Sequence, residues 1–99
     1  MNSVNITGTL GKDVKLSTLE NDIKVFNNTV CITENDLQDK FTWINIVAYE
    51  ELAEYIVENY SKNNFVIIQG KLKTRSWFDP ETEEKRYLTE VLIYKIEGI

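Results

Sequence analysis

The stretch FVIIQGKLKTRSW, residues 65–77, decides the fold and indicates the function. Positions 66, 68, 70, 72 and 74 carry Val, Ile, Gly, Leu and Thr, whereas positions 71, 73, 75 and 77 carry Lys, Lys, Arg and Trp. Because side chains alternate across a β-strand, one surface of this strand presents three cations and an indole. The stretch therefore predicts a strand with one apolar face and one face suited to an anionic, aromatic ligand.

Hydrophobic periodicity predicts four further strands and one helix. The helix is expected from Glu50, where apolar residues recur at helical spacing with glutamates on the other face, and Asn63-Asn64 supply a left-handed cap. The strands are expected at residues 4–12, 23–33, 41–49 and 86–96, with turns at Asn21-Asp22 and Asp79-Pro80 and an exposed polar loop over Glu34 to Lys40.

Three strands, a helix and two strands follow the order of the five-stranded OB-fold barrel, in which the helix lies between strands 3 and 4. The 99 residues contain no repeat and no linker, and this length is typical of one domain. We therefore expect a single OB-fold domain over residues 1–99, all-β with one helix. Other small β-barrels share this order of elements.

The composition argues against several function classes. The chain has no histidine, and Cys31 is its only cysteine, so we expect no metal site, no cofactor and no enzymatic activity, and a buried, unreactive thiol. No apolar run approaches the roughly 18 residues of a membrane helix, and no signal peptide is recognisable at the start. We therefore expect a cytoplasmic protein without a membrane role.

The net charge of −5 argues against nucleic-acid binding, because phosphate affinity comes from Lys and Arg. The distribution of the acids weakens this objection. Eight of them lie in two short segments that need not face a ligand: Glu50, Glu51, Glu54 and Glu58, and Asp79, Glu81, Glu83 and Glu84.

The expected strand at residues 41–49 is apolar on both faces. One face carries Ile44, Ile46 and Ala48, and the other carries Phe41, Trp43, Asn45, Val47 and Tyr49. Such a strand must be covered by the core on one side and by a ligand or a second subunit on the other. Trp43 and Tyr49 are therefore candidates for base stacking or for a subunit interface, and the two uses are compatible.

Residues Gly70 to Trp77, followed by Arg86-Tyr87-Leu88-Thr89-Glu90-Val91, resemble the signature of the bacterial single-stranded DNA-binding proteins. Residues 8–13, 43–49 and 52–54 resemble that family's first turn, third strand and helix, so the resemblance spans nearly all of the chain. It implies an OB-fold homotetramer that binds single-stranded DNA in replication, recombination and repair. Strand parity and the resemblance together give the expected contacts. These are Trp43, Tyr49 and Trp77 for stacking, and Lys71, Lys73, Arg75, Arg86, Asn45 and Lys12 as cationic or polar contacts.

The sequence also departs from that family. Val14 stands where proline is usual, Asn45 where some members have arginine, Glu50 where glycine is common, and Asn63-Asn64 where Lys-Gly is common; a family tryptophan near residues 34–36 is missing. We therefore expect weaker binding or a shorter binding site than a full-strength member has.

The family usually continues into a glycine-rich linker and an acidic tip that recruits partner enzymes, whereas this sequence stops at Ile99. The expectation is a truncated chain or a tailless phage, plasmid or organelle form, for which tail-dependent replication partners are doubtful. The small core makes at least a dimer sensible.

Two other functions remain open. The first is a protein-interaction module of the primosomal replication type, with secondary nucleic-acid binding, which the net negative charge favours. The second is an oligosaccharide-binding OB domain, which the three cations beside Trp77 disfavour. The sequence does not distinguish DNA from RNA as the preferred ligand.

Overall fold

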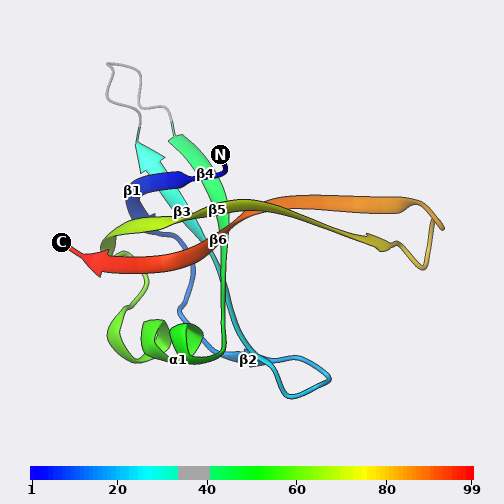
Figure 1. Ribbon diagram of the computed structural model, residues 1–99, viewed down its shortest axis with the longest axis horizontal. Coiled ribbons are helices and arrows are strands. Elements are labelled where there is room, and N and C mark those ends of the chain that lie inside the picture. Colours follow the sequence, from blue (N-terminus) through cyan, green and yellow to red (C-terminus); the bar gives the residue numbers. More distant parts are fainter. Residues whose placement is uncertain (34–40) are drawn as a thin grey trace.

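A computed structural model describes residues 1–33 and 41–99, and the polar loop and missing-tryptophan positions expected over residues 34–40 lie outside these ranges. The described residues form six strands and one helix (Figure 1). Within them, no helix is long and apolar enough to cross a membrane. The elements are β1 (Val4–Leu10), β2 (Ser17–Thr18), β3 (Lys24–Thr33), β4 (Phe41–Tyr49), α1 (Glu50–Asn59), β5 (Phe65–Phe78) and β6 (Lys85–Gly98).

The five long strands close into a ring in the order β1-β5-β6-β4-β3. The pairs Thr9–Cys31 and Leu10–Val30 join β1 to β3 and complete the ring. The helix follows the third long strand, as expected for the OB fold. It lies between β4 and β5, rather than between strands 3 and 4, because the two-residue β2 adds a strand to the count.

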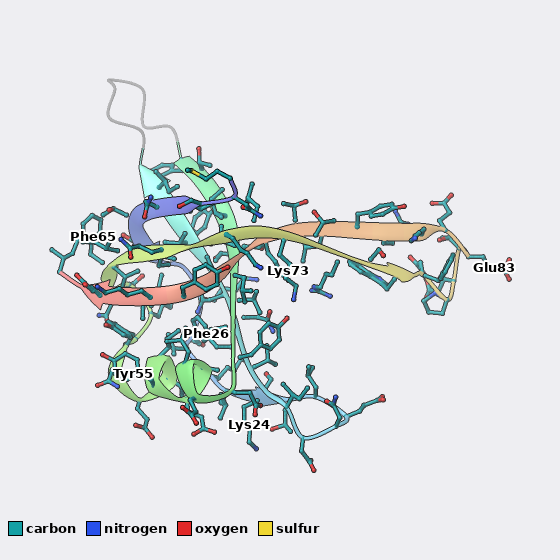
Figure 2. The ribbon with its side chains drawn as sticks, in the orientation of Figure 1. Lys24, Phe26, Tyr55, Phe65, Lys73 and Glu83 are labelled. Carbon is teal, nitrogen blue, oxygen red and sulfur yellow. The ribbon has the colours of Figure 1, made fainter. Side chains whose placement is uncertain are left out.

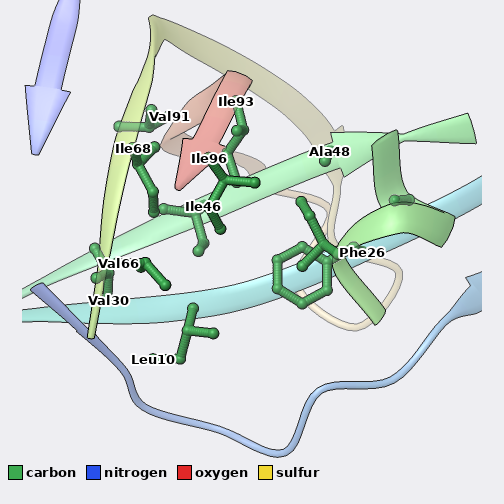
Figure 3. Close-up of a cluster of buried hydrophobic side chains, with 12 residues drawn as sticks. Leu10, Phe26, Val30, Ile46, Ala48, Val66, Ile68, Val91, Ile93 and Ile96 are labelled. Atoms are coloured by element: carbon green, nitrogen blue, oxygen red, sulfur yellow. The ribbon is translucent and has the colours of Figure 1, made fainter. Parts of the chain in front are cut away.

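The core fills the ring, and twelve buried apolar side chains contribute to it (Figure 3). Phe26 of β3 is fully buried, as are Ala53 and Ile56 of α1. The contacts between α1 and β3 place the apolar face of the helix against the part of the core that contains Phe26. Helical spacing of the apolar residues therefore has its expected role, which is to close the core.

Two boundaries differ from the sequence-based expectation. β1 ends at Leu10, because the Lys12 backbone does not pair with a strand; instead its N–H donates to Asn28 Oδ1 at 3.0 Å, and its carbonyl accepts from Asn28 Nδ2 at 3.1 Å. Asn63 has the expected left-handed conformation, with φ 75°, but it does not cap the helix. The helix ends at Asn59, and the Asn63 N–H donates to the carbonyl of Leu10 at 2.9 Å.

The apolar face expected along residues 66–74 ends at Gly70. Val66 and Ile68 are fully buried, whereas Leu72 is 50% exposed. The β5–β6 register shifts between Gln69 and Gly70, β1 pairs with β5 only as far as Gly70, and further along the two strands project from the ring as a long hairpin (Figure 1). Leu72 lies beyond the last β5 residue that pairs with β1, so it lacks the strand neighbour that Val66 and Ile68 have on that side.

Candidate nucleic-acid interface

The cationic side of β5 and the aromatic side of β4 lie on one surface of the ring. Val47 of β4 pairs with Leu92 of β6, and Leu92 pairs with Lys71 of β5. Directly paired residues point to the same side of a sheet. The outward side chains that share this side with Lys71 form what we call the outer face, although Val47 itself is buried.

Lys73 and Tyr49 meet on the outer face. The Lys73 ammonium donates a hydrogen bond to the Tyr49 hydroxyl at 2.8 Å, and its nitrogen lies 4.7 Å from the centre of the Tyr49 ring. Figure 2 shows Lys73 on the lower side of the β5 ribbon, at the point where the hairpin leaves the ring. A cation for phosphate and a ring for stacking are thus adjacent, although they come from strands far apart in the sequence.

Arg75 makes a second cation–aromatic pair. Its guanidinium carbon lies 5.1 Å from the ring centre of Trp77, within the range of a cation–π interaction. Its Nε lies 3.2 Å from Oε1 of Glu90. The Arg75 side chain is half-exposed, whereas that of Glu90 is only 2% exposed. The arginine is therefore held by a buried carboxylate while it faces solvent.

Two hollows, of about 200 and 180 Å³, adjoin at Asn27 and Arg75, which line both. We call the two hollows together the Arg75 groove. Residues of β3, β4, β5 and β6 line it, together with Lys12 and Leu19. Its lining residues are Lys12, Leu19, Val25, Asn27, Asn28, Asn45, Ile46, Tyr49, Arg75, Leu88 and Glu90.

Trp43 lies apart from the Arg75 groove. Its side chain is 59% exposed and packs over Gly11, beside a separate hollow of about 350 Å³ that Phe41 and Cys31 also line. Six positions along β4 separate Trp43 from Tyr49, which is about 20 Å of strand. Of the nine expected contacts, four line the Arg75 groove, and Lys73 and Trp77 contact residues that line it, whereas Trp43 lies beside a separate hollow. The four lining residues are Lys12, Asn45, Tyr49 and Arg75.

Cys31 is not buried as expected; it is partly exposed in the hollow beside Trp43. The reason is strand parity, because Cys31 pairs with Trp43 across β3 and β4 and shares its outward side.

Trp77 and Arg86 pair with each other on the projecting hairpin. Arg86 is not free: its Nε lies 3.4 Å from Asp79 Oδ2, and its Nη2 lies 3.8 Å from Glu84 Oε2. The acids of the hairpin loop therefore face one of the expected phosphate contacts. In contrast, the described residues provide no acidic side chain within 4 Å of the ammonium groups of Lys12, Lys71 or Lys73.

A comparison of the chain with protein families gives one clear match, in which the sequence model of the Single-strand binding protein family covers residues 1–99. The chain belongs to this family. It is also similar to the Single-stranded DNA-binding protein 1 of Chlorobaculum tepidum, with 34% identity over 98 residues. This alignment covers 93% of the chain and 60% of that relative, so the chain spans about three fifths of the relative's length.

The departure from the family at Glu50 has a structural consequence. Glu50 begins α1 with φ 55°, a left-handed conformation that glycine adopts without strain. Its side chain offers some compensation, since Oε1 accepts a hydrogen bond from the Lys24 backbone N–H at 2.7 Å. At this position, where the family resemblance led us to expect glycine, a glutamate makes the strand-to-helix turn and ties β3 to the helix.

Sequence reasoning missed several residues of this surface. Asn27 and Glu90 line the Arg75 groove, while Phe78 and Tyr87 stand 70% and 65% exposed on the hairpin. Glu90 lies directly opposite Lys73 in the β5–β6 register, a pairing that only the structure reveals. No group of three His, Cys, Asp or Glu side chains that could hold a metal ion occurs within residues 1–33 and 41–99.

Proposed function

We propose that this chain binds single-stranded DNA with little dependence on sequence, as a homodimer or homotetramer, and protects it during replication, recombination and repair in the cytoplasm. The chain's membership of the family supports this role. The observation that carries the mechanism is the outer face, where Tyr49 of β4 and Arg75 of β5 line one groove and Lys73 of β5 contacts Tyr49.

In this mechanism, bases stack on Trp43, Tyr49 and Trp77, because every base has a ring face and stacking needs no particular sequence. Backbone phosphates lie near the cations and polar groups between these rings. The proposed phosphate and polar contacts are Lys12, Asn45, Lys71, Lys73, Arg75 and Arg86. The hydrogen bond between Lys73 and Tyr49 gives way when a base covers the Tyr49 ring and a phosphate takes the ammonium.

The free protein already occupies several of these groups with its own side chains. Arg75 pairs with Glu90, Arg86 with Asp79 and Glu84, and Lys73 with the Tyr49 hydroxyl. Binding DNA through Arg86 and Lys73 must replace their present contacts, which reduces the net gain from these two cations. This supports the expectation of weaker binding than a full-strength family member shows.

The test is a titration of the purified protein with oligo-dT, followed by tryptophan fluorescence at low and moderate salt. We expect oligo-dT to quench the tryptophan fluorescence, and the quenching to weaken as salt is added. Absence of quenching at low salt would contradict the proposal. Trp77→Ala should lower the affinity by about 1 to 3 kcal/mol. Tyr55→Ala is the matched control, since Tyr55 is an exposed aromatic on α1, away from the outer face, and it should bind normally.

A second candidate function is a protein-interaction module of the primosomal type. The aromatic side chains of Phe78 and Tyr87, exposed on a hairpin that also carries acids, favour it. Two results together would support this alternative: the chain recovers a specific partner from nuclease-treated lysate, and oligo-dT does not quench its tryptophan fluorescence. Parallel titrations with oligo-dT and oligo-U would establish the preference between DNA and RNA.

A further inference from the structure

Glu90 is a buried carboxylate on a surface proposed to bind an anion. Its side chain is 2% exposed, and it lines the Arg75 groove together with Lys12 and Asn45. A carboxylate out of water is costly unless a cation and hydrogen bonds compensate it. A negative charge here also repels phosphate. Its presence in the groove therefore requires an explanation beyond solubility.

The contact with Arg75 supplies that explanation. The pair is diagonal across β5 and β6, since Arg75 lies opposite Leu88 and Glu90 is two residues further along. The bond uses Nε of the arginine, at 3.2 Å. A guanidinium has five N–H donors, and four of them belong to the two terminal nitrogens. In the described part of the chain, no hydrogen bond or ion pair uses those two nitrogens of Arg75.

Trp77 restrains the plane of the Arg75 guanidinium, in addition to the contact of Glu90 with its edge. The ring of Trp77 lies 5.1 Å from the guanidinium carbon, while Glu90 holds Nε on the side of β6. Two neighbours thus restrict a long, half-exposed side chain that would otherwise sample many rotamers. Ordering such a side chain on binding costs free energy, and a side chain ordered beforehand avoids this cost.

We propose that Glu90 is a positioning residue for single-stranded DNA: its carboxylate orients Arg75 so that the two terminal nitrogens face a backbone phosphate while the guanidinium stays on Trp77. This inference rests on the proposed function. Arginine suits the role because its fork can bind a carboxylate at one edge and a phosphate at the other, whereas lysine has a single ammonium.

The positioning role and simple electrostatics predict opposite effects of Glu90→Gln on the affinity for DNA. If Glu90 acts only as a negative charge near DNA, Glu90→Gln strengthens binding, because one repulsive charge is removed. If Glu90 positions Arg75, the same change weakens binding, because the neutral amide holds the guanidinium less firmly. The size and shape of the side chain are preserved, so packing changes little.

The experiment compares Glu90→Gln with Glu81→Gln in oligo-dT titrations. Both changes remove one negative charge from the hairpin strands or their loop, and Glu81 has no ion pair within the described residues. We expect Glu90→Gln to lower the affinity about tenfold, near the lower end of what one hydrogen bond to a charged group contributes. Glu81→Gln should bind as tightly as the unmodified chain, or somewhat more tightly.

Two further variants exclude a purely structural effect. Arg75→Lys keeps the charge and stays half-exposed, so it should fold, yet it should lose most of the affinity that Arg75→Ala loses. Glu90→Gln should have no further effect on binding in the Arg75→Ala background. Near-ultraviolet circular dichroism of each variant checks the fold.

The possible failures can be told apart. Absence of quenching by the unmodified chain would reject the proposed function itself. Normal quenching by that chain, with Glu90→Gln and Glu81→Gln binding equally well, or with Arg75→Lys binding normally, would overturn the positioning role alone.

Discussion

At the scale of single residues, Gly11 determines where the indole of Trp43 lies. A Cβ atom at position 11 would collide with Cζ3 of Trp43 and approach Thr29 Oγ1 to 2.8 Å. The indole is the far end of a side chain and can move away, whereas the strand beneath it cannot. The absence of a side chain at Gly11 therefore allows the Trp43 ring to approach the turn after β1 closely.

We predict that Gly11→Ala displaces Trp43 and lowers the affinity for oligo-dT severalfold, with little loss of thermal stability. Tryptophan emission should change in the free protein, because Trp43 moves. Gly8→Ala is the contrasting variant: its Cβ would meet the backbone carbonyl of Cys31, which has no room to shift. That change should lower the melting temperature instead. Equal effects of the two variants on stability would contradict this assignment.

The sequence predicted the orientation of residues that depend on local strand parity, but not the role of residues that depend on a neighbouring strand. Trp43, Tyr49 and Trp77 follow from strand parity, which is a local property of the sequence. Glu90 could not be singled out, because its importance comes from a diagonal neighbour on another strand. Likewise, Cys31 was expected to be buried because it is a small strand residue, and only its pairing with Trp43 shows that it points outward.

At the scale of elements, the start of α1 combines backbone strain with a tertiary hydrogen bond. Glu50 has φ 55°, and its carboxylate accepts the N–H of Lys24. Glu50→Ala should retain the strain and lose the hydrogen bond, whereas Glu50→Gly should lose the bond but relieve the strain. We predict that the alanine variant is about 1 kcal/mol less stable than the glycine variant. Urea denaturation measures the difference, and the reverse order would contradict it.

The tip of the β5–β6 hairpin contains a second residue of this kind. Glu83 has φ 58°, and its N–H donates to the carbonyl of Asp79 at 2.8 Å. Glu83→Gly should therefore stabilise the protein by about 0.5 to 1 kcal/mol. Glu81→Gly, which changes the charge equally at a residue without positive φ, should instead destabilise it. Thermal melts of the two variants test this prediction. If both changes shift the melting temperature in the same direction, the explanation from backbone conformation is wrong.

Elements whose ends depend on local sequence were predicted well. β4 spans the expected residues 41–49, and the turn near Asp22 has the left-handed residue that such turns favour. The end of β1 and the end of α1 were misplaced, since distant contacts with Asn28 and Leu10 determine them. The exposure of Leu72 also escaped prediction, because nothing local indicates where a hairpin leaves the ring.

At the scale of the whole molecule, an acidic protein is proposed to bind a polyanion. The net charge is −5, and part of that negative charge directly neutralises the binding cations. Asp79 and Glu84 both lie within 4 Å of Arg86. In the proposed mechanism, the acids of the hairpin loop therefore reduce the attraction between the outer face and DNA.

We predict that the double variant Asp79→Asn, Glu84→Gln binds oligo-dT about two- to fivefold more tightly, since an exposed ion pair contributes about 0.2 to 1 kcal/mol. The slope of log affinity against log salt should steepen by up to about 0.7, as one more phosphate contact forms. The control is Glu54→Gln, Glu58→Gln on α1, which makes the same change in net charge away from the outer face. An equal gain in both double variants would show that only net charge matters.

The pairing of β1 with β5 affects how late in translation the ring can form. β1 pairs with β5 from Val4–Gly70 to Thr9–Phe65, and the side chain of Asn2 bonds both the N–H and the carbonyl of Leu72, 70 positions away. At about 5 to 20 residues per second, β1 is synthesised roughly 4 to 14 s before this partner exists. Until then β1 has only its two pairs with β3 available, and the ring can close only after β6, the last strand, has been made.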